Sequence, residues 1–226
     1  METQSTAGYF LSPQQSQLWL LQQRADTPFV SQIAMLIEGP LDHSQLHKAL
    51  RQAVARHEIL RTVFRRPAGM KRPFQIILDG SEASWAIASS PASANAANAA
   101  DEVLLAHARE PFDFEQGPLV RATLIECAPQ QSVFVLTTPT LCADGASLTI
   151  LWREILAFYA GASDSLNSEP LRYVQFAQWQ SELLESTDEA ATEGKAFWRQ
   201  RAESGELQVE IPYESKTSTE TAQNSW

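Results

Sequence analysis

The turn at residues 138–147, with the sequence TPTLCADGAS, holds the side chains best placed for chemistry. An apolar run leads into this turn and a helical apolar stripe follows it, and functional residues commonly lie on such connections. Its only ionisable groups are Cys142 and Asp144. Cys142 is a candidate nucleophile, but no histidine lies near it in the sequence to activate the thiol. We interpret Cys142 as a small packed hydrophobic residue, the commoner role of a free cysteine.

The remaining cysteine and the histidines do not form a metal-binding pattern. The four histidines are scattered without ligand spacing: His43, His47, His57 and His107. We expect His57 to be structural and the other three to lie on helix surfaces. A hairpin across residues 128–131 would place Cys142 about 33 Å along a strand from Cys127, which excludes a disulfide. The sequence contains no phosphate-binding glycine loop, and we expect no metal and no bound cofactor.

The composition is typical of a folded domain that does not bind nucleic acid. The 226 residues are 44% hydrophobic and 19% charged, and the net charge is −10. Residues 1–80 carry 9 basic and 6 acidic residues, whereas residues 81–226 carry 8 basic and 21 acidic ones. A nucleic-acid-binding protein would need a basic face. The sequence contains neither an apolar run long enough to span a membrane nor a signal peptide. We therefore expect a cytoplasmic protein with no membrane partner.

Hydrophobic periodicity and capping residues predict an α/β fold. Ser12, Pro13 and Gln15 form a capping-box signature at the start of a helix. A second helix begins at Asp42 and has an apolar stripe consisting of Leu46, Ala49, Leu50, Ala53 and Val54. Four further helices are expected. One ends near Glu110, one is ended by Gly161, and two lie at about 170–186 and 193–204.

Strands are expected between these helices. They are predicted at 31–39, 60–64, 73–78 and 84–88, and in a hairpin formed by LVRATLIEC and SVFVLTT. The second hairpin run is apolar on both faces, so we place it centrally in the sheet. The predicted architecture is a two-layer α/β sandwich with a mixed sheet. Residues 214–226 have no periodicity, and we expect them to be a disordered tail.

Several of these segments together resemble one family, the condensation domains of nonribosomal peptide synthetases. YFLSPQQSQLWLL is similar to the family's first motif, Leu-Ser-x-x-Gln-x-x-x-Trp. ARHEILRTVF matches the second, Arg-His-Glu-x-Leu-Arg-Thr-x-Phe, at every fixed position. The matching residues are Arg56, His57, Glu58, Leu60, Arg61, Thr62 and Phe64. FDFEQGPLVRATL, LRYVQFAQWQ and FWRQRAESGELQVEIP are similar to later parts of the family's N-terminal lobe, in the expected order.

The resemblance covers residues 8–213, preceded by an extension at 1–7, and implies half of a domain. A family domain has two chloramphenicol-acetyltransferase-like lobes with the active site in a tunnel between them. This chain resembles only the N-terminal lobe, so the resemblance implies a second lobe as a partner. The chain is either a fragment of a larger synthetase or a naturally halved domain. An isolated lobe would expose the face that its partner covers, so we also expect self-association.

The third motif of the family departs from its pattern here. That motif is His-His-x-x-x-Asp-Gly, and aligning it on Asp144 and Gly145 places Pro139 and Thr140 at the two histidine positions. The resemblance associates catalysis with the second histidine, which accepts or orients the proton of the nucleophile. A threonine hydroxyl donates or accepts hydrogen bonds but is not a base near neutral pH. Some activity survives only if catalysis there is mainly positioning.

The resemblance also implies structural roles around the turn. Asp144 would form an ion pair with an arginine of the second motif, with Arg56 the first choice and Arg61 the reserve. Alternatively, or in addition, Asp144 caps the following helix, as its residue type and place allow. Gly145 would permit a close approach or a positive φ.

Three functions remain open from the sequence. The chain is half of a condensation-type domain with a degenerate site that serves a structural or recruiting role, with a tailoring enzyme as a possible partner. Alternatively, once completed by its second lobe, it joins an acyl donor to an amine or hydroxyl acceptor. Both substrates would be phosphopantetheine thioesters on carrier proteins, and phosphopantetheine would be the only cofactor involved. The third possibility is a standalone acyltransferase of the wider superfamily, which Thr140 and the missing lobe both disfavour.

Overall fold

The computed structural model describes residues 8–70, 72–80, 83–89, 96–166 and 169–205. The chain divides into two units, residues 1–181 and residues 182–226. The predicted N-terminal extension and the predicted C-terminal tail lie outside the described residues.

A four-stranded mixed sheet is the centre of the first unit. Its strands lie in the order β2-β7-β6-β5: β2 is Val30–Glu38, β7 is Gln131–Pro139, β6 is Arg121–Ala128 and β5 is Ser84–Ser89. β6 and β7 form the predicted hairpin, β2 pairs antiparallel with β7, and β5 pairs parallel with β6. Residues 132–139 of β7 are buried throughout. Strands buried on both faces lie at the centre of a sheet, and β7 does so.

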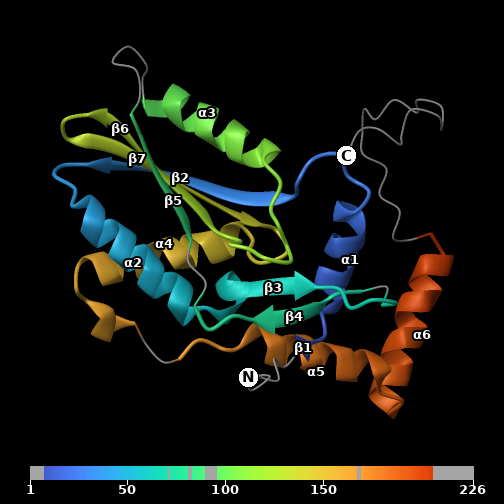
Figure 1. The fold of residues 1–226 in the computed structure, drawn as a ribbon. Coiled ribbons are helices and arrows are strands. Elements are labelled where there is room, and N and C mark those ends of the chain that lie inside the picture. Colours follow the sequence, from blue (N-terminus) through green and yellow to red (C-terminus); the bar gives the residue numbers. More distant parts are fainter. Residues whose placement is uncertain (1–7, 71, 81–82, 90–95, 167–168, 206–226) are drawn as a thin grey trace. The chain divides into compact units, whose positions relative to one another are not determined.

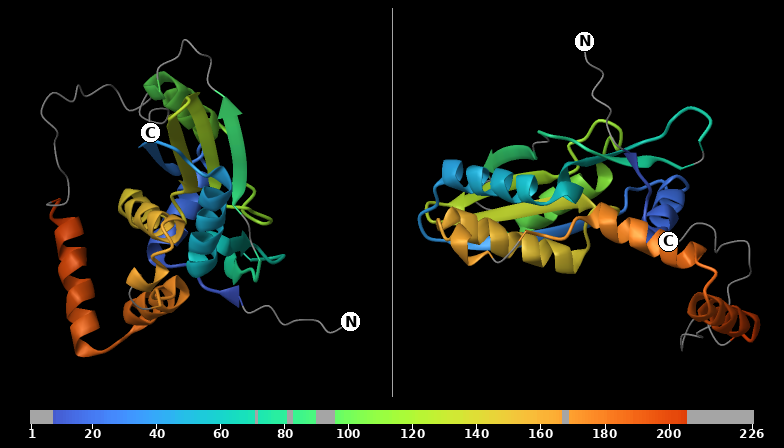
Figure 2. Two further views of the ribbon diagram at one scale, coloured as in Figure 1. Left: turned by 90° about the vertical axis from the view of Figure 1, so that its left-hand side faces the viewer. Right: turned by 90° about the horizontal axis from the view of Figure 1, so that it is seen from below.

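Helices cover both faces of this sheet (Figure 1). Helices α2 (His43–Arg56) and α4 (Gly145–Tyr159) pack on the face that carries Phe134 and Leu136. Helix α3 (Ala96–Arg109) packs on the opposite face. Seen from below in the right-hand view of Figure 2, α2 and α4 lie in front of the strands.

The predicted α/β class with a mixed sheet is confirmed, with one addition. The helix expected to end near Glu110 is α3, and the two-layer prediction did not place it on the second face of the sheet, which it covers. The alternation along β7 explains this arrangement, because Val133 and Val135 point toward α3 whereas Phe134 and Leu136 point toward α2 and α4.

A smaller antiparallel sheet stands beside α1. Its order is β1-β4-β3, with β1 at Gly8–Tyr9, β4 at Phe74–Ile77 and β3 at Thr62–Arg65. A short 3-10 helix, η1 (Glu58–Arg61), connects α2 to β3. Helix α1 (Pro13–Gln22) begins with the predicted capping box between Ser12 and Gln15. The four fixed residues of the first motif are all buried: Leu11, Ser12, Gln15 and Trp19.

The first and second motifs meet in one aromatic cluster. The ring of Trp19 lies 6.4 Å from that of Phe64 and 5.6 Å from that of Phe114, between ring centroids. Gln15 and Trp19 lie one turn apart on the same face of α1. The spacing of the first motif therefore places one polar and one aromatic side chain toward β3 and the turn after β7.

The later elements of the chain are a 3-10 helix and two α-helices. They are η2 (Ser163–Ser165), α5 (Tyr173–Glu185) and α6 (Glu189–Glu203). Val174 and Ala177 are the buried residues of α5. In the second unit, Asp188 caps α6 by accepting a hydrogen bond from the Ala191 amide at 2.8 Å. None of the residues of α6 is buried, although Phe197 and Trp198 are large and apolar.

Candidate active site

The turn between β7 and α4, residues 139–144, is called the corner below. Its backbone is fixed at both ends by hydrogen bonds. The Thr140 amide donates to the Phe29 carbonyl at 3.0 Å, which continues the β2–β7 pairing by one residue. The Cys142 amide donates to the Pro139 carbonyl at 2.8 Å and closes the turn. The corner is therefore an ordered connection with a defined direction for each side chain.

Thr140 is half-buried at this corner, and among the described residues its hydroxyl has one weak side-chain partner. Its Oγ1 lies 3.4 Å from the Ser31 hydroxyl on β2. It also borders a hollow of only about 10 Å³ beside Leu18 and Trp19. Ser31 is another hydroxyl, and two hydroxyls near neutral pH supply no general base.

None of the four histidines, all within the described residues, is hydrogen-bonded to Thr140. His57 Nε2 lies 2.6 Å from Glu154 and His43 Nδ1 lies 3.6 Å from Glu126. His47 stacks on the Trp85 ring, and both nitrogens of His107 contact threonine hydroxyls. The corner therefore contains Thr140 without an imidazole hydrogen-bonded to it.

Asp144 caps α4, as one of the two sequence interpretations expected. Its Oδ1 accepts hydrogen bonds from the Ser147 amide at 2.8 Å and from the Ser147 hydroxyl at 2.6 Å. These bonds favour the carboxylate and hold the pKa of Asp144 below its usual value. The side chain is exposed. An exposed carboxylate with two local donors needs no buried cation to be stable.

The expected ion pair between Asp144 and Arg56 is absent from the described residues, and this expectation is corrected. Arg56 Nε lies 3.4 Å from Glu154 instead. Glu154 lies about 15 Å along the helix axis from Asp144, because each helical residue adds 1.5 Å. The end of α2 therefore meets the middle of α4, where an arginine cannot reach the cap.

The reserve partner Arg61 is also engaged elsewhere. Its Nη1 donates to the Leu78 carbonyl at 2.5 Å, and its Nη2 lies 3.8 Å from Glu58. Gly145 has no positive φ, and a Cβ built on it would meet nothing within 4 Å. The expected backbone role of Gly145 is therefore not observed in the described part of the chain.

The residues of the second motif stabilise the fold around η1. Glu58 accepts a hydrogen bond from Arg172 Nε at 2.8 Å and thereby ties η1 to the start of α5. Thr62 Oγ1 donates to the Glu58 carbonyl at 2.7 Å. Leu60 and Phe64 are 3% and 0% exposed. The structural role expected for His57 agrees with its contact to Glu154.

Cys142 packs beside the aromatic cluster of α1 and β3. Burial raises the pKa of its thiol to about 12. The thiol is therefore protonated near neutral pH and is a poor nucleophile. Cys127 and Cys142 are both free, as the exclusion of a disulfide predicted.

Sequence reasoning missed a buried polar cluster beneath α3. His107 is 9% exposed rather than on a helix surface. Its Nδ1 lies 2.9 Å from Thr137 Oγ1 and its Nε2 lies 3.1 Å from Thr123 Oγ1. Gln32 donates to Thr137 Oγ1 at 3.1 Å. Burial and the nearby Arg121 lower the pKa of His107, whereas Glu110 raises it by a smaller amount.

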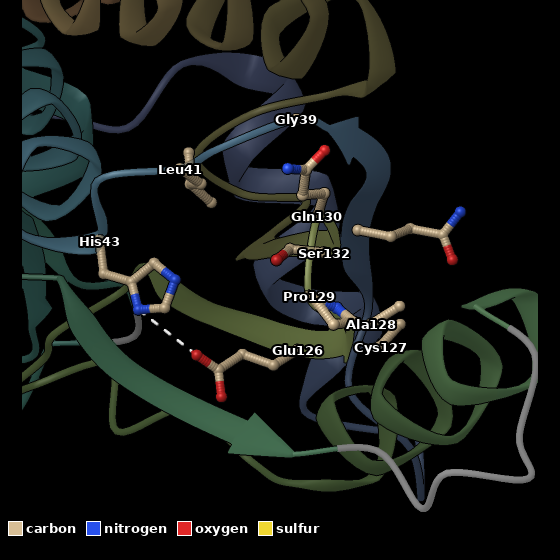
Figure 3. A pocket seen from close by; sticks show the side chains of 10 residues that line it. Gly39, Leu41, His43, Glu126, Cys127, Ala128, Pro129, Gln130 and Ser132 are labelled. Carbon is tan, nitrogen blue, oxygen red and sulfur yellow. Dashed lines mark ion pairs between the residues drawn. The ribbon is translucent and has the colours of Figure 1, made fainter.

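Two larger hollows lie away from the corner. One, of about 380 Å³, is bordered by His43, Glu126 and Ser132 (Figure 3). It lies at the Glu38–Gln131 end of the β2–β7 pair, whereas the corner follows the Val30–Pro139 end. The other, of about 780 Å³, is bordered by Arg56, Arg61 and Arg172. Arg56 lies within 4 Å of Glu154, whereas Arg61 and Arg172 both lie within 4 Å of Glu58.

Two other kinds of site are absent from the described part of the chain. No helix there is long and apolar enough to cross a membrane. No group of three or more His, Cys, Asp or Glu side chains there is arranged to hold a metal ion.

Sequence comparison connects the chain to peptide synthetases. The family model described as "Condensation domain" matches residues 5–226. Tyrocidine synthase 3 of Brevibacillus parabrevis is 32% identical over 203 residues, which are 89% of this chain and 3% of that protein. Phosphinothricin tripeptide synthetase PhsC of Streptomyces viridochromogenes is 30% identical over 213 residues, 90% of this chain and 19% of that protein. The chain therefore spans a small part of these relatives.

Structural comparison gives a consistent result. A starter condensation domain of the rhizomide synthetase RzmA superimposes with a TM-score of 0.76 at 22% identity, over 93% of this chain and 48% of that chain. The X-domain from teicoplanin biosynthesis superimposes with a TM-score of 0.71 at 27% identity, over 84% and 42%. The chain thus spans about half the length of these structures.

Proposed function

Because this chain belongs to the condensation domain family, we propose that it is the N-terminal half of a condensation-type domain whose histidine-dependent chemistry has been lost. The parent protein would be a nonribosomal peptide or hybrid polyketide–peptide synthetase. The fold of the half-domain would be retained for a structural or recruiting role.

The proposal rests on the residue type and the surroundings of Thr140. Thr140 occupies the histidine position of the third motif, and its hydroxyl faces the hydroxyl of Ser31. General acid–base catalysis contributes about 10²–10⁴-fold to a rate, and no imidazole is hydrogen-bonded to Thr140 in the described residues. The capping role of Asp144 explains why the rest of the motif would persist without catalysis, since this residue stabilises α4.

A recruiting role is supported by one relative in particular. A second structure of the teicoplanin X-domain, a complex with OxyB, superimposes with a TM-score of 0.74 over 95% of this chain. In that protein, a domain with this fold binds another protein. By analogy, a tailoring enzyme is the partner class that we propose for this chain.

The alternative is an active domain once the second lobe is present. Such a domain would join an acyl group on one carrier protein to an amine or hydroxyl on another, with both substrates held as phosphopantetheine thioesters. Under this alternative, catalysis would rest on positioning two bound substrates, which can itself supply much of a rate enhancement. The backbone hydrogen bonds that fix the corner would then matter more than the side chain of Thr140.

The experiment that separates these functions uses the complete parent polypeptide with loaded donor and acceptor carrier proteins. Intact mass of the acceptor carrier reports condensation. We expect no product above a carrier-only control for the native protein, and product from Thr140→His if only the base is missing. The matched control is Thr192→His, which changes a threonine of the second unit. This variant should remain inactive.

Each outcome bears on a different part of the proposal. Product from the native protein well above the control would overturn the non-catalytic assignment. Product from Thr140→His alone would support the loss of a proton acceptor as the cause. Inactivity of both proteins would support the non-catalytic assignment and show that further residues of the site have diverged.

A further inference from the structure

Two buried amide side chains lie behind the corner, and the capping box accounts for only one contact of one of them, Gln15. Gln15 on α1 is 2% exposed and Gln75 on β4 is 0% exposed. A buried amide that lacks a partner destabilises a fold, so each of its polar atoms must be accounted for. All four polar side-chain atoms of this pair have partners.

The partners of Gln15 determine which way its amide points. The Ser12 amide donates to Gln15 Oε1 at 3.0 Å, and Gln15 Nε2 donates to the Leu141 carbonyl at 3.3 Å. A backbone N–H requires an oxygen and a carbonyl requires a donor, so the opposite orientation would leave both without a partner. The side chain therefore joins the start of α1 to the corner, next to Thr140.

Gln75 extends this chain to the small sheet. Gln15 Nε2 also donates to Gln75 Oε1 at 3.1 Å, and Gln75 Nε2 donates to the Phe10 carbonyl at 2.8 Å. Because the side-chain oxygen of Gln75 faces Gln15, its side-chain nitrogen needs another acceptor. The Phe10 carbonyl is that acceptor. β1, β4, α1 and the corner are thus connected through two side chains.

We infer that Gln15 is a positioning residue, which fixes the position of the corner. In this inference, Gln75 orients the side-chain amide of Gln15. The Leu141 carbonyl held by Gln15 belongs to the residue that follows Thr140, so a displacement at this bond moves the Thr140 side chain. This inference does not depend on the proposed loss of catalysis, because a catalytic or a recruiting corner requires a fixed geometry.

Glutamine is the residue type that meets this requirement. The position needs one acceptor for Ser12 and donors for both Leu141 and Gln75. An ionised glutamate offers only acceptors, and it would bring a buried negative charge against the carbonyl oxygens of Leu141 and Gln75. The third helical position of a capping box directs the side chain back toward the cap, which brings the amide within reach of all three partners.

The same cap reaches α5 within the first unit. The Ser12 hydroxyl accepts a hydrogen bond from the Gln15 amide at 3.1 Å and lies 2.8 Å from the Tyr173 hydroxyl. Ser12 is 0% exposed. Tyr173 therefore contacts the cap that aligns Gln15, and through it the corner.

Hydrogen–deuterium exchange of the protein, read by mass spectrometry, tests this inference. The variant is Gln15→Glu, and the reporter is the exchange rate of peptides that contain the Thr140 and Cys142 amides, compared with peptides from β6. We expect exchange at the corner to rise about tenfold, the scale of one lost buried hydrogen bond, with β6 unchanged. The matched control is Gln14→Glu, an exposed neighbour on α1, which should leave both rates unchanged.

Protonation provides a readout that a role in packing alone would not affect. Protonating the introduced carboxyl restores one O–H donor, and burial raises the pKa of such a group. After correction for intrinsic exchange, acidification should therefore return the corner-to-β6 ratio of Gln15→Glu toward the native value. At each pH, native protein and Gln14→Glu should share one ratio, because any effect of His107 protonation on β6 is common to all three proteins.

Two results would overturn the inference. One is unchanged exchange at the corner in a folded Gln15→Glu protein. The other is an equal rise in the corner and in β6, which would indicate general destabilisation. If Gln15→Glu does not fold, Gln15→Met removes both polar groups without adding charge, with Gln14→Met as its control. Acceleration confined to the corner is again expected, and its absence would contradict the inference.

Discussion

At the scale of single residues, the corner keeps one side chain of the family's third motif, the aspartate, and has a threonine where the resemblance implies the second histidine. Asp144 retains a role in folding, because its carboxylate caps α4 through Ser147. Thr140, four residues earlier in the chain, lacks the imidazole that the resemblance associates with proton transfer. Under the proposed loss of catalysis, the cap on α4 would explain why Asp144 persists.

Substitution of Asp144 distinguishes the cap from an ion pair. Asp144→Ala removes the acceptor, and the free energy of unfolding should fall by about 1 kcal/mol, the usual cost of losing an N-cap. Asp144→Asn keeps an acceptor for the Ser147 amide and should lie close to the native value. Chemical denaturation measures both. An Asn variant as unstable as the Ala variant would instead show that the charge of Asp144 matters.

At the scale of elements, the packing of α3 on the sheet depends on a polar cluster as well as on apolar contacts. Ala99 and Ala100 pack against Ile125 and Val133, and His107 lies near the end of the same helix. The hydroxyls of Thr123 and Thr137 accept or donate as the neutral imidazole requires. His107 is thus stable in this interface as a neutral group.

The stability of the fold should therefore depend on the protonation of His107. The pKa of His107 is lowered in the folded state. As the pH falls through about 6.5, the ordinary pKa of histidine, the unfolded chain therefore binds a proton at His107 more readily than the folded chain does. The free energy of unfolding should consequently decrease from about pH 7 down to the lowered pKa of the folded state. Denaturation curves measured across this range test the prediction.

A matched pair of variants assigns this pH dependence. His107→Gln removes the titrating group and should flatten the dependence below about pH 7, although its stability at higher pH also falls. His43→Gln is the matched control, because it removes an imidazole beside Glu126 and leaves His107 in place. An equal slope in native protein and in His107→Gln would show that another group is responsible.

Local signals in the sequence predicted most elements but not their long-range partners. The caps at Ser12 and Asp42, and the apolar stripe of α2, predicted helix starts that the structure confirms. The contact of Arg56 with Glu154 depends on the crossing of α2 and α4, which no local pattern encodes. His107 was placed on a surface because the threonines that satisfy it lie on β6 and β7, far away in the sequence.

The candidate site was predictable to the same extent. The motif alignment assigned Thr140 to the histidine position, which stays a prediction, and residue type predicted the cap by Asp144, which the structure confirms. The amide pair of Gln15 and Gln75 was not predicted, because 60 residues separate its members. Gln15 was interpreted as a local capping residue, and its second contact, with Leu141, becomes visible only in the folded chain.

At the scale of the whole molecule, the chain spans about half of the condensation-type structures it resembles. Several large apolar side chains of the first unit are exposed, including Phe10 at 69%, Leu171 at 94% and Trp179 at 55%. Exposed apolar surface of this kind marks an interaction site or promotes association. The net charge of −10 opposes association through repulsion between copies.

The balance of these two effects gives a prediction for the chain in solution. We expect reversible self-association that strengthens as salt screens the repulsion between acidic molecules. Light scattering over a range of protein and salt concentrations measures it, and Trp179→Gln should weaken it. A strictly monomeric species at high concentration and high salt would contradict the prediction.

The pH dependence of single-turnover condensation tests most directly whether Thr140 has replaced a proton acceptor. The complete polypeptide would be mixed with loaded carrier proteins, and the rate of acyl transfer followed between about pH 6 and 9, a range that spans the titration of an imidazole. The account predicts that the native rate equals the carrier-only rate at every pH, whereas any rate gained by Thr140→His rises as its imidazole loses a proton. A native rate well above the carrier-only control would contradict it.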